Sequence, residues 1–151
     1  VSNYNWKVDK ATLAFWEKQS TTVRKNIAPK PDDLTVEEFT NQFLSALSKE
    51  GKIDYWWTRG NTFDPPILQR IFQSQDRRLH LDEYLKFWRV RDTRTYIDAK
   101  LDFPKVNGFV PLQDENKWNK FFQEHDSAWD VTADLLRLQA IARAENDLEM
   151  V

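Results

Sequence analysis

The chain has 151 residues, a formal net charge of −2 and a sequence pI of about 5.7, so no overall positive charge draws it to nucleic acid or to an anionic membrane. It contains no cysteine, which excludes disulfides and thiolate chemistry, fits a reducing compartment and leads us to expect a cytoplasmic protein. Hydrophobic residues make up 40% of the chain and aromatic residues 14%, enough for one core. We therefore expect a single helical domain over residues 1–151, with 102–113 as the place where a sub-boundary would fall.

The N-terminal part predicts two helices. The first covers roughly 9–26 and ends before a proline-rich linker. The second covers 36–50: Thr35 and Glu38 have the spacing of a capping box, and Gly51 supplies a C-terminal cap. Apolar residues at helical spacing support this second helix.

The middle of the chain predicts a short strand followed by a pair of helices. Residues 53–57 form a β-prone apolar run that also fits a last helical turn. Asp64 followed by Pro65 is typical of an N-cap and a first-turn proline, which predicts a helix over 64–76. Apolar residues at i, i+3, i+4 and i+7 then predict a helix over 81–92.

The C-terminal part predicts a turn and a long helix. Asn107-Gly108 between apolar residues favours a hairpin near 105–110, although a plain loop fits as well. Ser127 and Asp130 resemble a second capping box, which predicts a long helix after them. The fold class is thus mainly α, a bundle of about five to six helices. The order of elements also matches a winged helix-turn-helix domain, which we keep as the alternative.

Catalytic and metal-binding patterns are missing from the sequence. The two histidines, His80 and His125, are too few for a multi-histidine metal site, and the three glycines form no phosphate-binding loop. The run Glu124-His125-Asp126 resembles a catalytic cluster, but neighbouring side chains on a helix point in different directions, so we interpret it as a solvated helix end. We therefore expect no enzyme activity, no cofactor and no small-molecule substrate. No apolar run is long enough to cross a membrane.

Charge is unevenly distributed along the chain. Residues 66–100 hold eight basic and five acidic residues, a net charge of +3, whereas 114–151 hold four basic and nine acidic residues, a net charge of −5. The basic side chains that would contact nucleic acid in the winged-helix alternative are Arg77, Arg78, Lys86, Arg89, Arg91 and Arg94. These side chains equally fit a solvated face that pairs with acidic C-terminal helices.

Trp56 and Trp57 are the candidate partner-binding residues. Adjacent residues cannot both face one core, so one of the two indoles is expected to be exposed or covered by a partner. The leading hypothesis is a non-enzymatic module that binds another protein or a second copy of itself. Nucleic-acid binding through the 77–94 surface and a structural role in a larger assembly are the alternatives. We expect Trp56→Ala and Trp57→Ala to differ, one lowering stability and the other lowering association.

Overall fold

The computed structural model describes residues 7–102, 105–110, 122–123 and 125–149. The chain is mainly α, as expected from the sequence, with one two-stranded sheet among these residues. The described elements, in chain order, are α1 Lys10–Glu17, α2 Thr21–Ile27, α3 Val36–Glu50, β1 Trp56–Thr58, α4 Asp64–Gln73, α5 Arg78–Tyr84, the 3-10 helix η2 Phe87–Arg89, β2 Val90–Asp92, α6 Thr93–Lys100 and α8 Ser127–Glu149. No helix in the described ranges is both long and apolar enough to cross a membrane.

The chain divides into two compact units, the first made of residues 1–33 and 114–132 and the second of 34–113 and 133–151. The helix α8 contributes its first residues to the first unit and its remainder to the second. The expectation of a single domain stays a prediction.

Residues 9–27 form two helices where the sequence predicted one. The Asp9 carboxylate accepts a hydrogen bond from the backbone N–H of Thr12 at 2.7 Å and begins α1. The Ser20 hydroxyl accepts one from the N–H of Val23 at 3.3 Å and begins α2. The expected helix over 9–26 is therefore wrong at 18–20, because Ser20 caps a new helix there.

The second unit begins with α3, which has the predicted bounds. The Thr35 hydroxyl accepts from the Glu38 N–H at 3.2 Å, and the Glu38 carboxylate accepts from the Thr35 N–H at 2.8 Å. Gly51 ends the helix with φ of 71°, a conformation that glycine adopts without strain. The capping box and the glycine cap are both confirmed.

The strands β1 and β2 pair in parallel, with Trp56 opposite Val90 and Thr58 opposite Asp92. The predicted strand exists, shifted from 53–57 to 56–58. The predicted helix over 81–92 is wrong, because Leu85 leaves the helical region with φ of −102° and ψ of 80° and the chain continues through η2 into β2. A wing would need an antiparallel hairpin, so this sheet does not match the winged-helix alternative.

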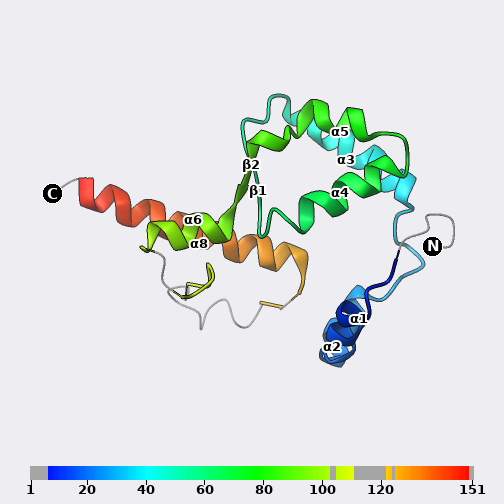
Figure 1. The fold of residues 1–151 in the computed structure, drawn as a ribbon, viewed down its shortest axis with the longest axis horizontal. Coiled ribbons are helices and arrows are strands. Elements are labelled where there is room, and N and C mark those ends of the chain that lie inside the picture. The colour runs from blue at the N-terminus through cyan, green and yellow to red at the C-terminus, as the bar shows by residue number, and fades with distance from the viewer. Residues whose placement is uncertain (1–6, 103–104, 111–121, 124, 150–151) are drawn as a thin grey trace. The chain divides into compact units, whose positions relative to one another are not determined.

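The core of the second unit lies where α3, α4 and α5 meet on one side of the strands (Figure 1). Its buried side chains are Phe72, Leu81 and Leu85. The Phe43 ring from α3 meets the Phe72 ring from α4 at 5.7 Å in an edge-to-face arrangement. Edge-to-face aromatic pairs add to the apolar area that these helices bury against one another.

The end of the chain forms the predicted long helix, α8, but with a different cap. Asp126, not Ser127, accepts hydrogen bonds from the N–H groups of Ala128 at 3.0 Å and Trp129 at 3.3 Å. Asn107-Gly108 forms a turn in which the N–H of Phe109 donates to the carbonyl of Val106 at 2.9 Å. The residues described around this turn form no strand, so the hairpin is wrong and only the turn is present.

Candidate functional site

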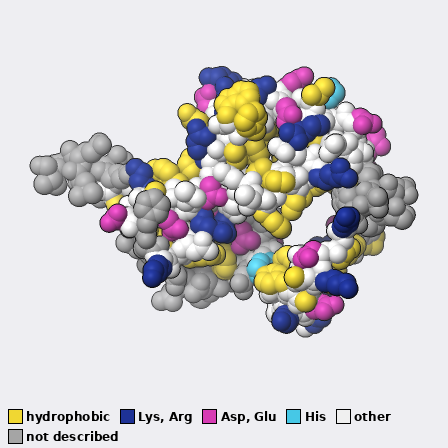
Figure 2. Space-filling model, in the orientation of Figure 1, with side chains coloured by type: hydrophobic (Ala, Val, Ile, Leu, Met, Phe, Trp, Pro, Cys, Tyr) yellow, Lys and Arg dark blue, Asp and Glu magenta, His cyan; other side chains and the backbone are white. Residues whose placement is uncertain are grey.

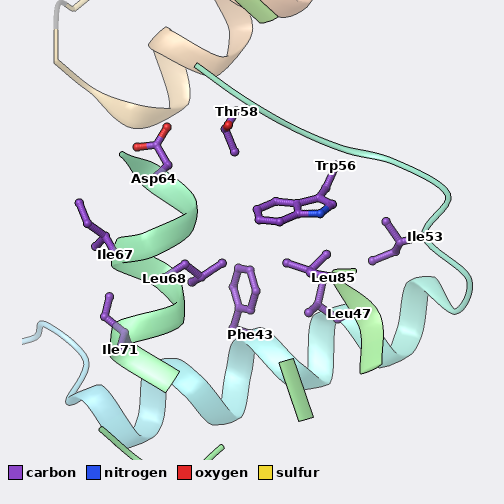
Figure 3. Close-up of a pocket in the computed structure, with 10 residues that line it drawn as sticks. All are labelled: Phe43, Leu47, Ile53, Trp56, Thr58, Asp64, Ile67, Leu68, Ile71 and Leu85. Carbon is purple, nitrogen blue, oxygen red and sulfur yellow. The ribbon is translucent and has the colours of Figure 1, made fainter. Parts of the chain in front are cut away.

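An apolar pocket of about 480 Å³ opens in the second unit (Figure 3). Its walls come from α3, α4, β1 and the segments beside them, and the lining side chains are Phe43, Leu47, Ile53, Trp56, Thr58, Asp64, Ile67, Leu68, Ile71 and Leu85. Asp64 and Thr58 lie together at one end, and the apolar side chains line the rest. A concave apolar site of this size with a few polar groups is typical of a ligand pocket.

Asp64 is the ionisable residue on this pocket, and its carboxyl group has an unusual environment. Burial by neighbouring groups raises the pKa of the carboxyl above its ordinary value of 3.8, the positive charge of Arg94 opposes this rise, and the negative charge of Asp92 adds to it. The residue itself stands on the exposed rim, so the apolar surroundings act on a carboxyl that a ligand can still reach. A perturbed carboxyl in a pocket is a candidate for chemistry.

The expected capping role of Asp64 is wrong. The residue before it, Phe63, is the N-cap of α4, and no side chain caps this helix. Asp64 is instead the first helical residue, followed by prolines that need no N–H partner. Its carboxyl group is therefore not engaged in closing the first turn of α4.

Asp92 lies at the same edge of the sheet, because parallel strands end together and Asp92 pairs with Thr58. Its carboxylate accepts from the N–H of Thr95 at 2.8 Å and from the N–H of Asn61 at 3.1 Å. Burial disfavours the charged form of Asp92, but these backbone hydrogen bonds outweigh it and hold the pKa of the carboxyl below 3.8. Asp92 thus begins α6 and also fixes the loop that leads from β1 to Asp64.

A third carboxylate, Asp134 on α8, is buried at this edge between two arginines. The Arg59 guanidinium donates from Nε at 3.0 and 3.1 Å and from Nη2 at 2.5 Å, and Arg137 donates from Nη1 at 3.1 Å. The Thr93 hydroxyl lies 2.9 Å from the same carboxylate. Arg59 also donates to the carbonyl of Gly108 at 3.2 Å. This cluster ties the end of β1, the start of α6, the turn at 106–109 and α8 into one structure.

Arg94, one of the predicted nucleic-acid contacts, lies at this edge as well. Its charge acts on the carboxyl of Asp64. Its Nε is buried and has no hydrogen-bond partner within the described part of the chain. The positive charge of Arg94 next to Asp64 makes it a candidate for contact with an anionic ligand such as phosphate.

The other predicted basic residues have different partners within the second unit, and their assignment to nucleic-acid binding stays a prediction. Arg77 donates to Asn41, Arg78 pairs with Asp82 at 2.9 Å, and Arg89 donates to the carbonyl of Ile53 at 2.6 Å. Lys86 and Arg91 lie instead against exposed aromatic rings.

The two tryptophans of β1 face in different directions, as alternation along a strand requires. Trp56 lines the pocket, and its indole N–H donates to the carbonyl of Lys86 at 3.0 Å. Trp57 is 43% exposed and meets the Tyr96 ring at 5.4 Å. Their assignment as partner-binding residues stays a prediction.

His125 in the first unit has backbone geometry that the sequence did not indicate. It adopts a left-handed φ of 61° immediately before the Asp126 cap, so it is not part of α8. Its imidazole meets the rings of Phe15 at 5.7 Å and Trp16 at 5.3 Å. Left-handed backbone at a non-glycine residue is often found at functional sites. Asp130 follows on the exposed side of the first turns of α8.

Across the described ranges, no three or more His, Asp or Glu side chains gather closely enough to hold a metal ion.

Comparison with known proteins defines the class of protein. The model of the 3′-5′ exoribonuclease Rv2179c-like domain matches residues 1–131, and the chain belongs to this family. An exodeoxyribonuclease of Enterobacteria phage T4 is 31% identical to the chain over 163 residues. That alignment covers 93% of this chain and 66% of the phage protein, so the chain spans just under two thirds of its relative. No solved structure matches.

Membership of this family contradicts the leading hypothesis of the sequence analysis. A non-enzymatic module that binds a protein or self-associates is wrong, and so are the expectation of no enzyme activity and the winged-helix alternative. The error has a physical origin. The sequence offers no compact motif, because Asp64 resembles an ordinary N-cap and His125 resembles part of a charged helix end.

Two signals could have corrected this interpretation. Phe63 is a large apolar residue directly before Asp64, which does not fit a solvated N-cap at Asp64. Pro65 and Pro66 have no N–H group, so the first turn of α4 has little need of a capping side chain. Asp126 is as good a cap as Ser127, which would have placed His125 outside the helix.

Proposed function

We propose that this chain hydrolyses phosphodiester bonds of a nucleic acid, releasing nucleotides from the 3′ end. The observation that carries the proposal is the family match over residues 1–131, supported by the similarity to a phage exodeoxyribonuclease. The raised pKa of the Asp64 carboxyl also supports the proposal, because such a group accepts a proton more readily than an ordinary carboxylate.

In the proposed reaction, water attacks the phosphorus atom while Asp64 takes a proton from it. A bond forms between the water oxygen and phosphorus, one ester P–O bond breaks, and the leaving oxygen gains a proton. The partly exposed Arg94 guanidinium, whose charge acts on Asp64, is proposed to contact a phosphate oxygen. Charge-assisted contacts of this kind stabilise the negative charge that builds up on the phosphate during the attack.

In the first unit, His125 and Asp130 are the candidate catalytic residues. An imidazole is the side chain best suited to exchange a proton at neutral pH, and Asp130 offers an exposed carboxyl five positions later. The aromatic contacts of His125 with Phe15 and Trp16 hold its ring in a defined place. We propose that His125 contributes to hydrolysis by transferring a proton.

The two comparisons name different polymers, RNA for the family and DNA for the phage relative. The test therefore uses both, as single strands labelled at the 5′ end, with Mg²⁺ or Mn²⁺ present because such ions assist many phosphodiester hydrolases. We expect a ladder of products that shorten from the 3′ end. Asp64→Asn should slow the reaction by about a hundredfold or more, as loss of a general base does.

Asp54→Asn is the matched control, because Asp54 is an exposed carboxylate that pairs with Lys52. It should hydrolyse both polymers at the wild-type rate. His80→Ala on α5 is the corresponding control for His125→Ala, which should also slow hydrolysis. The proposal fails if neither polymer is shortened from its 3′ end, or if Asp64→Asn and Asp54→Asn behave alike.

A further inference from the structure

The amino ends of β1 and β2 carry a group of exposed aromatic rings. Tyr55, just before β1, is 57% exposed, and Phe87 and Trp88 in η2, just before β2, are 69% and 59% exposed. Because the strands are parallel and Trp56 pairs with Val90, these two segments lie at one edge of the sheet. A contiguous group of exposed apolar side chains often marks an interaction site.

Two cations lie among these rings. The Arg91 guanidinium stands 4.4 Å from the centre of the Tyr55 ring, and its Nη1 donates to the carbonyl of Trp88 at 3.1 Å. The Lys86 ammonium stands 6.0 Å from the centre of the Trp88 ring. The rings of Phe87 and Trp88 meet edge to face at 5.0 Å. We call these five residues the amino-end surface.

Charge around the amino-end surface is positive. The segments 52–55 and 86–91 contain four basic residues, Lys52, Lys86, Arg89 and Arg91, and one acidic residue, Asp54, a net charge of +3. Asp54 is itself paired with Lys52 at 2.7 Å. Figure 2 shows apolar side chains bordered by Lys and Arg at the upper end of this unit, where the strands begin in Figure 1.

Exposed rings with interleaved cations and a positive field suit one kind of ligand, a flexible polymer with flat bases and negative phosphates. We propose that the amino-end surface binds single-stranded nucleic acid, with bases stacked on Trp88 and Tyr55 and phosphates held by Lys86 and Arg91. This inference rests on the proposed function, since it supplies a second contact for the same substrate.

The position of the amino-end surface determines whether it would affect the affinity for the substrate or the rate of hydrolysis. Asp64 follows the carboxyl end of β1, whereas Tyr55 precedes its amino end, so the two lie at opposite ends of the sheet. The amino-end surface would hold a strand at a distance from the reacting bond. It should therefore increase the affinity for long strands and leave the hydrolysis rate of a dinucleotide unchanged.

The test measures fluorescence anisotropy of a labelled oligo(dT) or oligo(U) with protein that carries Asp64→Asn, which keeps the probe intact. Trp88→Ala and Tyr55→Ala should each weaken binding about tenfold, as expected for loss of one stacked base. Trp88→Phe keeps a ring and should retain most of the affinity. The pair Lys86→Gln and Arg91→Gln should reduce the dependence of affinity on salt.

Leu79→Ala is the matched control, because Leu79 is 78% exposed on α5 and lies outside the surface. It should leave the affinity unchanged, and circular dichroism melting should show that all variants fold. The inference is overturned if Trp88→Ala binds within about twofold of its parent, if duplex binds as tightly as a single strand, or if the ring variants change self-association instead. Failure of the proposed function shows separately, because the wild-type protein would then shorten neither RNA nor DNA from its 3′ end.

Discussion

Two kinds of carboxylate lie at the carboxyl ends of β1 and β2. Asp134 and Asp92 are held by hydrogen bonds, the first by two arginines and a threonine and the second by backbone N–H groups. Asp64 begins α4 without any capping bond, and burial raises the pKa of its carboxyl. Two of these acids therefore maintain the structure, and the third remains available to react.

The largest expected effect comes from removing Asp134. Asp134→Ala leaves the half-buried Arg59 and Arg137 without their shared partner and should lower the free energy of unfolding by about 3 kcal/mol. Urea denaturation measures this loss. The double variant Arg59→Met with Asp134→Leu should recover part of it, since only Arg137 then remains without its charge partner. A loss below about 1 kcal/mol would mean that this cluster does not hold the edge together.

Removing Asp92 should have a smaller effect. Asp92→Ala deletes the N-cap of α6 and the contact with the Asn61 N–H, at a cost of about 1–2 kcal/mol in unfolding free energy. Because the pKa of Asp92 is lowered by folding, its contribution is complete above pH 3.8 and disappears as pH falls through the lowered value. Thermal melting across this range should show wild type and variant converging in acid.

Asp64 should show the smallest effect on stability, with the opposite sign. The folded protein disfavours its charged form, so the carboxylate lowers stability as pH rises through the raised pKa. Asp64→Asn should therefore melt at or slightly above the wild-type temperature at neutral pH, and the two should coincide below pH 3.8. Clear destabilisation by Asp64→Asn at neutral pH would place Asp64 with the structural acids.

Sequence reasoning succeeded where the determining residues are close in the chain. The helix α3 has its predicted bounds because Thr35, Glu38 and Gly51 act within that helix. The apolar positions that predicted the helix over 81–92 include Leu81, Leu85 and Trp88. Leu81 and Leu85 are buried as expected, but Trp88 is exposed because the chain leaves the helix at Leu85.

The candidate site depends on contacts between distant residues, which no local pattern reveals. The pairing of β1 with β2 joins residues separated by α4, α5 and η2, and Arg59 meets Asp134 across 75 positions. Asp64 was visible in the sequence, but its lack of a capping role followed only from the geometry of Phe63 and α4.

The contact between Arg59 and Asp134 also has a consequence for synthesis of the chain. Arg59 is synthesised 75 residues before its partner Asp134, which lies on α8. Closing so long a loop is slow compared with forming local helices. We therefore expect the edge beside Asp64 to form after the local helices, because it needs the contact between Arg59 and Asp134.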